Sequence, residues 1–214
     1  MSLTRKPWAL RQKRTGVADW IERTTAALER PASPSSDFDL NKSIELPESR
    51  KLRAAAVLAA ILPKADGAHR LILTKRSAAL KHHPSQIAFP GGKQDDTDAS
   101  LQAAALREAY EEIGLEPGNV DILGHLPSHE TVTGFQVTPF IGLVKTPFAA
   151  VPETGEVDEV FDVPLAHVLD PARFSVEGRM WQGRRRSYYA VPYGPYYIWG
   201  ATARILRAWT DLMT

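Results

Sequence analysis

The chain has 214 residues, of which 43% are hydrophobic and 24% charged, as in a globular protein with one domain of ordinary size. Its 26 Lys and Arg residues balance 25 Asp and Glu residues, so it lacks the basic excess typical of a nucleic-acid-binding protein. The absence of cysteine excludes disulfides and thiolate zinc sites, and no apolar run approaches the roughly 18 residues of a membrane span. The basic N-terminus lacks the apolar segment of a secretion signal, so we expect a cytoplasmic protein.

The first fifty residues are predicted to form a helical extension and a linker. Residues 16–30 place apolar side chains at the spacing of a short amphipathic helix: Val17, Trp20, Ile21, Ala26 and Leu28. The sequence PASPSSD at 31–37 has the composition of a linker. We therefore divide the chain into an N-terminal extension, residues 1–50, and a main domain, residues 51–214.

Strand-like and helical segments alternate along the main domain. The apolar run at 52–62 and the segment at 70–76 are expected to form a hairpin around the turn-like sequence PKADGAH. Residues 99–113 have helical spacing, and Gly114 stands where a helix C-terminal cap belongs. The further expected elements are strands at 120–126 and 135–144, a strand turning into a short helix at 161–170, a hairpin at 179–193 turning near Gly183, and a C-terminal helix at 200–213. This order predicts an α/β or α+β fold with a mixed sheet.

Three glutamates fall within five residues of the segment REAYEEIGL at 107–115. They are Glu108, Glu111 and Glu112. Apolar side chains are expected on the opposite face of the helix: Leu106, Ala109, Tyr110 and Ile113. Like charges three and four residues apart on a helix repel by roughly a few tenths of a kcal/mol per pair. A hard divalent cation such as Mg²⁺, which prefers oxygen ligands, would offset this repulsion.

An isolated acidic cluster is more often a solvated helix face than a metal site. The neighbouring residues change that balance. Arg107 is four residues before Glu111 and can hold it in orientation, and the upstream PGG at 90–92 lets a ligand approach the backbone closely. A carboxylate cluster facing a glycine loop suits a metal ion bound to phosphate oxygens.

Residues 91–115, GGKQDDTDASLQAAALREAYEEIGL, resemble the Nudix hydrolase signature, G-x5-E-x7-R-E-U-x-E-E-x-G-U with U an aliphatic residue. The half from Arg107 to Leu115 matches closely. The first half departs, because Asp98 stands in place of the glutamate and eight residues separate it from Arg107. In the coenzyme A pyrophosphatase branch of the family, GGK-x-D-x-x-D with the extra residue is the usual form.

A second motif of that branch, L-L-T-x-R-S-x3-R-x3-G-x3-F-P-G-G, resembles residues 72–92, ILTKRSAALKHHPSQIAFPGG. Lys81 replaces the second arginine of the pattern and Ser85 replaces its first glycine. Lysine keeps the charge but loses the bidentate fork, and serine matters if that backbone needs a positive φ. The resemblance covers about residues 50–210.

The resemblance implies a Nudix-type α/β/α sandwich with a mixed central sheet, so the main domain would be a Nudix hydrolase domain. It implies hydrolysis of coenzyme A or acyl-coenzyme A to adenosine 3′,5′-bisphosphate and 4′-phosphopantetheine or its acyl derivative, with Mg²⁺ or Mn²⁺ as cofactor. The alternatives are a pyrophosphatase for ADP-ribose or NADH, and a non-catalytic nucleotide-sensing module. The expected partner is a small-molecule substrate, not a nucleic acid or a membrane, and a homodimer is possible.

By the same resemblance, Glu108 and Glu112 are the principal metal ligands, and Glu111 is a further ligand or the general base. Arg107 orients a glutamate. Glu159, favoured over Glu156 in the segment PETGEVDEVFDVPL, is a further candidate for the catalytic base. Substrate contacts are expected at five positions: Arg76, Lys81, Gly91, Gly92 and Lys93.

Overall fold

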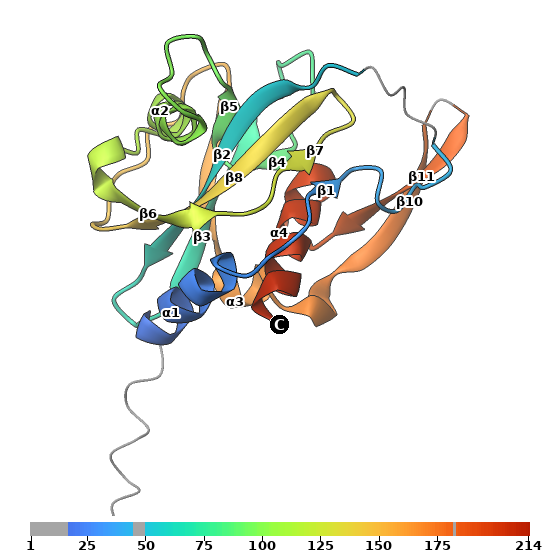
Figure 1. Cartoon of the computed structure of the whole chain (residues 1–214). Helices are drawn as coiled ribbons and strands as arrows, with labels where there is room; N and C mark the ends of the chain where they lie inside the picture. The colour runs from blue at the N-terminus through green and yellow to red at the C-terminus, as the bar shows by residue number, and fades with distance from the viewer. Residues whose placement is uncertain (1–16, 45–49, 182) are drawn as a thin grey trace, which may run out of the picture.

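The computed structural model describes residues 17–44, 50–181 and 183–214 (Figure 1). Its helices are α1 (Val17–Leu28), α2 (Leu101–Ile113), α3 (Leu165–Val168) and α4 (Gly200–Met213). Its strands are β1 (Ser35–Ser36), β2 (Arg53–Pro63), β3 (His69–Arg76), β4 (Ile87–Ala88), β5 (Gly91–Lys93), β6 (Val120–His125), β7 (His129–Glu130), β8 (Phe135–Val144), β9 (Val157–Pro164), β10 (Ser175–Trp181) and β11 (Arg184–Ala190). No helix in these residues is long and apolar enough to span a membrane.

A nine-stranded mixed sheet forms the middle layer, as the sequence predicts. Its main path runs β1-β7-β8-β2-β3-β4, with β5 on β2, β6 on β8 and β9 on β3. Strands β2 and β8 are parallel from Arg53 opposite Phe135 to Ile61 opposite Leu143. Helix α2 covers one face, and α4 lies on the other with α1 and α3 (Figure 1). The α/β/α sandwich is therefore confirmed.

Strand β2 is buried on both faces, which explains its uninterrupted apolar sequence. Its alternate residues enter two separate cores, Ala55 and Ala59 on the α4 side and Ala56 and Ala60 on the α2 side. A strand at the centre of a covered sheet has no solvent face, so the usual alternation of apolar and polar residues is lost. Its short alanine side chains meet an alanine-rich face of α2 formed by Ala104, Ala105 and Ala109.

Helix α2 is capped at both ends, and the C-terminal cap at Gly114 is the one that the sequence predicts. The Ser100 hydroxyl accepts a hydrogen bond from the Ala103 N–H at 3.1 Å, and Gly114 adopts a φ of 70° at the C-terminus. The predicted buried face is rotated, however. Tyr110 is 48% exposed, whereas Glu112 is only 4% exposed. Packing against β2 selects the small alanines, so the bulkier Tyr110 turns outward and Glu112 turns inward.

The N-terminal segment packs against the rest of the chain at several places. Helix α1 contacts α4 and β6, and β1, inside the predicted linker 31–37, pairs with β7. The hydroxyl of Ser35 lies 2.9 Å from Nδ1 of the fully buried His129, whose Nε2 lies 3.2 Å from Asp37. The linker prediction is thus wrong at β1. The division of the chain at residue 50 stays a prediction, and residues 1–16 and 45–49 of the extension lie outside the described residues.

Candidate active site

Strand β5 brings two glycines against the acidic residues of α2. The Gly91 N–H donates to Oε2 of Glu112 at 3.2 Å. A Cβ at Gly92 would lie 2.6 Å from Oε1 of Glu108. A Cβ at Gly91, whose φ is 149°, would lie 2.4 Å from the Ala56 carbonyl oxygen. A side chain at Gly91 would therefore push β5 from the backbone of β2, whereas one at Gly92 would displace the Glu108 carboxylate.

Arg107 is the centre of a hydrogen-bond cluster at this surface. Its Nε and Nη2 donate to the two carboxylate oxygens of Asp98, each at 2.9 Å, and its Nη1 donates to Glu111 at 2.7 Å. Nη1 also lies 3.1 Å from Glu108, and Nη2 donates to the Lys93 carbonyl at 3.3 Å. The bidentate geometry fixes the plane of the guanidinium. Arg107 thereby ties the loop after β5 to the glutamates of α2.

The electrostatics of the cluster follow from burial and from these partners. Burial raises the pKa of Glu112 to about 7, although the Gly91 N–H and the Arg76 charge oppose the shift. Burial also raises the pKa of the half-buried Glu108. The hydrogen bonds from Arg107 lower the pKa of Asp98, and the Asp98 contact raises that of Arg107. Two adjacent carboxyl groups with raised pKa values lack a sufficient positive partner.

The donor atoms at Glu108 and Glu112 fit a hard divalent cation. Their carboxylate oxygens face the glycine backbone of β5, and a cation there would supply the missing positive charge. Glu111 does not converge with them, because its side chain is 53% exposed and bound to Arg107. Accordingly, no group of three acidic or histidine side chains in the described residues is already arranged around a common point.

The two candidate acids of the later segment lie in different environments. Glu156 contributes a negative charge that raises the pKa of both Glu108 and Glu112. Glu159 instead accepts a hydrogen bond of 2.6 Å from the Tyr196 hydroxyl. The ring of Tyr196 stacks on Phe161 with a centroid distance of 3.6 Å. The sequence gives no indication of this contact, which holds Glu159 in place from the loop that precedes α4.

Two further predicted substrate contacts are Arg76, the last residue of β3, and Lys81, in the loop at 77–86 that follows it. Arg76, at the end of β3, acts on the Glu112 carboxyl, whereas the side chain of Lys81 is exposed. Ser85 has a φ of 57°, so the position where the branch pattern has glycine is left-handed here. His83, two residues earlier, has a φ of 56°. Ser85 therefore holds a backbone conformation that glycine adopts more readily.

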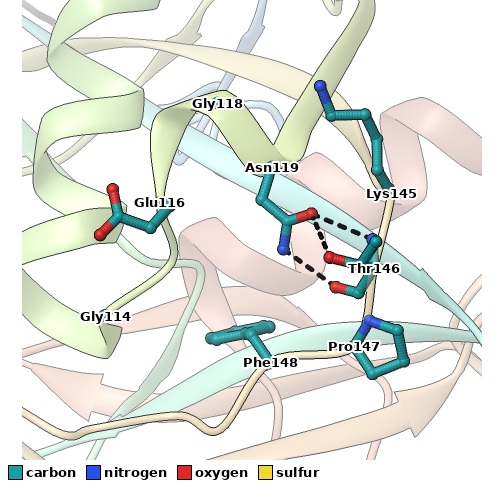
Figure 2. Close-up of a pocket in the computed structure, with 8 residues that line it drawn as sticks. All are labelled: Gly114, Glu116, Gly118, Asn119, Lys145, Thr146, Pro147 and Phe148. Atoms are coloured by element: carbon teal, nitrogen blue, oxygen red, sulfur yellow. Dashed lines mark hydrogen bonds between the residues drawn. The ribbon is translucent and has the colours of Figure 1, made fainter.

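Two cavities among the described residues contain no predicted site residue. The larger, of about 580 Å³, lies behind the C-terminus of α2 (Figure 2). There Asn119 exchanges hydrogen bonds with the backbone and hydroxyl of Thr146, which joins the walls. The other, of about 330 Å³, lies between β6, β8 and the start of α2. The three glutamates of α2 thus line neither cavity.

This sandwich, with an acidic helix seated on a glycine strand, has the architecture of a Nudix domain. The NUDIX domain family matches residues 52–188, and the chain therefore belongs to the Nudix hydrolases. Nudix hydrolases generally use divalent metal ions.

Two relatives, both NudL proteins, support this assignment. The chain is 42% identical over 172 residues to the uncharacterized Nudix hydrolase NudL of Cronobacter sakazakii, covering 80% of this chain and 88% of that protein. It is 41% identical over 160 residues to NudL of Escherichia coli, covering 75% and 82%. A solved Nudix hydrolase from M. smegmatis, RenU, is 26% identical with a TM-score of 0.47, covering 54% of this chain and 73% of its own. Those names specify no substrate.

Proposed function

We propose that the protein hydrolyses the diphosphate bond of coenzyme A or acyl-coenzyme A, releasing adenosine 3′,5′-bisphosphate and 4′-phosphopantetheine or its acyl derivative. The observation that carries the proposal is the packing of Glu108 and Glu112 on the Gly91–Gly92 backbone, directly after the 72–92 motif. The left-handed φ of Ser85 supports the branch assignment, because the branch pattern has glycine there, the residue that adopts this conformation most readily.

Glu108 and Glu112, with the Gly92 carbonyl, would hold Mg²⁺ or Mn²⁺, which would neutralise the diphosphate and lower the pKa of bound water. Glu111 would join them after leaving Arg107, whose guanidinium keeps Asp98 as its partner. The positive charges of Arg76, Lys81 and Lys93 would attract the phosphates, and the bare backbone of Gly91 and Gly92 would let them approach.

The general base accepts a proton from water as the water attacks phosphorus and the bridging P–O bond breaks. Glu111, Glu156 and Glu159 are the candidates for this role. Glu156 lies within electrostatic range of the two buried glutamates. Glu159 would need to exchange its Tyr196 partner for water or act from its other oxygen. We favour Glu156 over Glu159 on this ground, and the catalytic role of Glu159 stays a prediction.

A product assay tests the function. The protein is incubated separately with coenzyme A, ADP-ribose and NADH, first with Mg²⁺ and then with Mn²⁺, and products are identified by mass. We expect adenosine 3′,5′-bisphosphate from coenzyme A and slower reaction of the other two. Faster cleavage of ADP-ribose or NADH would overturn the substrate but keep the chemistry. Intact ligands after long incubation, with tight binding, would instead support a sensing module.

A cytoplasmic location of the protein remains a prediction.

A further inference from the structure

Strands β10 and β11 form a separate two-stranded ribbon beside the main sheet (Figure 1). Two apolar residues of β10 are unusually exposed, since Val176 is 56% and Met180 68% accessible to solvent. In the part of the chain that the structure describes, β10 pairs only with β11. An isolated hairpin is marginally stable in water, and a free strand edge is a template for another strand.

The other edge of the ribbon is already covered. The Asn41 side chain donates to the Ser187 carbonyl at 2.9 Å and accepts from the Ser187 N–H at 2.8 Å. Asn41 thus takes the place of a neighbouring strand at the middle of β11. A further strand could be added at β10 but not at this point of β11.

The Asn41 contact also fixes which backbone groups β10 presents. Ser187 points its N–H and carbonyl away from β10, so its pair with Gly178 is a non-hydrogen-bonded pair of the antiparallel ladder. Gly178 must therefore point its own N–H and carbonyl outward. By the alternation of the strand, Val176 and Met180 do the same.

A second copy of β10 complements this edge. In an antiparallel pairing with Gly178 opposite Gly178 of the second copy, Val176 lies opposite Met180 and Glu177 opposite Arg179. The first pair joins the two exposed apolar residues on one face. The second is a cross-strand pair of opposite charge at a non-hydrogen-bonded position, where side chains approach most closely. The exposed Arg185 guanidinium now lies over Gly178 and can turn toward solvent.

We propose that the protein forms a two-fold symmetric dimer through antiparallel pairing of β10 with β10 of a second copy, centred on Gly178. Three residues of each strand, Val176, Gly178 and Met180, supply one donor and one acceptor each. The pairing uses the free β10 edge of both copies, and Asn41 blocks the β11 edge at Ser187. The assembly therefore contains two copies. The contact is small, so association is expected at micromolar concentrations.

Cross-linking tests the register directly, because the chain has no cysteine. Gly178→Cys places two thiols about 5.5 Å apart between Cα atoms at the two-fold axis, within the range of a disulfide. Val176→Cys is the matched control on the same edge, where the two cysteines would be about 14 Å apart. Mild oxidation should link Gly178→Cys into a covalent dimer and leave Val176→Cys largely unlinked. Equal linking of both, or of neither, overturns the proposal.

Charge exchange tests the same contact in solution. The mass of the wild-type protein, measured by sedimentation from about 1 to about 200 µM, should rise from 23.6 kDa toward twice that value. Glu177→Arg and Arg179→Glu should each abolish the rise, since each places like charges opposite one another. The double variant Glu177→Arg/Arg179→Glu should restore it. A wild-type chain that stays monomeric, or a dimer that both single variants leave intact, overturns the proposal, provided that melting temperatures show the variants folded.

Discussion

Asp98 and Arg107 are joined by two hydrogen bonds of 2.9 Å, although Asp98 stands where the general Nudix signature has a glutamate one residue nearer to the arginine. The shorter side chain and the extra residue compensate each other, so the guanidinium still reaches Glu111. Asp98 touches no glutamate of the cluster among these contacts. It acts on the cluster through the orientation of Arg107.

Asp98→Asn tests this positioning role. The amide retains the shape but is uncharged and has a single acceptor oxygen, so it cannot accept both hydrogen bonds from Arg107, which should lose its fixed plane. We expect kcat to fall roughly 10- to 100-fold, as for residues that support a metal site, with little change in KM. The measurement is steady-state kinetics at saturating Mg²⁺. Asp96→Asn, on an exposed carboxylate nearby, is the control. Equal losses in both variants would contradict a specific role for Asp98.

The two glycines of β5 should fail in different ways. Ala at Gly92 meets the Glu108 side chain, which can rotate aside, so the protein should fold but lose at least about tenfold in kcat because the carboxylate is displaced. Ala at Gly91 meets the backbone of β2 at a φ of 149°, so unfolding free energy should fall by more than about 2 kcal/mol. Thermal melts and activity of both variants separate the two effects. A Gly91→Ala protein as stable as Gly92→Ala would refute this account.

The buried Glu112 predicts a pH-dependent stability in the metal-free protein. The folded protein holds the Glu112 proton to about pH 7, whereas the unfolded chain releases it near the ordinary pKa of 4.5. Unfolding then releases a proton between these values, so the unfolding free energy falls as pH rises from 4.5 through 7. The loss amounts to roughly 3 kcal/mol when complete.

Glu112→Gln removes this titration. Without metal, the variant should gain stability over the wild type as the pH rises from about 5 to about 8, as followed by melting temperature. Addition of Mg²⁺ or Mn²⁺ should raise the melting temperature of the variant less than that of the wild type. The kcat of the variant should be lower by more than about a hundredfold. Glu111→Gln, on the exposed part of the same helix, is the stability control. An active Glu112→Gln enzyme would show that Glu112 holds no metal.

Glu156 and Glu159 can be separated as bases by paired substitutions. Glu156→Gln should lower kcat by at least about a hundredfold, the range for a general base, and flatten the acidic limb of the pH–rate profile. Glu159→Gln and Tyr196→Phe should change kcat much less, because the hydrogen bond between Glu159 and Tyr196 lies outside the glutamate cluster of α2. The reverse order, with Tyr196→Phe shifting the profile, would assign the base to Glu159.

The sequence predicts the elements whose signal is local. The C-terminal cap of α2 at Gly114, the strand in the apolar run of β2 and the hairpin near Gly183 depend on neighbouring residues, and each forms as expected. The features that the sequence predicts wrongly depend on contacts between residues distant in sequence. The inward position of Glu112 follows from the alanine face that β2 selects, and β1 forms because β7 lies beside it.

The same distinction holds within the candidate site. Spacing places the glutamates on one helix and the glycines before it, but only the folded chain shows that Glu111 is bound to Arg107 and Glu159 to Tyr196. Tyr196 is 37 residues from Glu159, so no local pattern links them.

Ser85 offers a stability test of the loop that precedes the glycine strand. Its φ of 57° costs a non-glycine residue about 1–2 kcal/mol, whereas glycine adopts it freely but loses more backbone entropy on folding. Ser85→Gly should therefore raise the unfolding free energy by about 0.5–1 kcal/mol, and Ser85→Val should lower it by more than about 1 kcal/mol. Ala78→Gly, in the same loop at an ordinary φ, should destabilise through entropy alone. Denaturant titration of the three variants decides, and a Ser85→Gly protein destabilised as much as Ala78→Gly would mean that the left-handed turn is not present in solution.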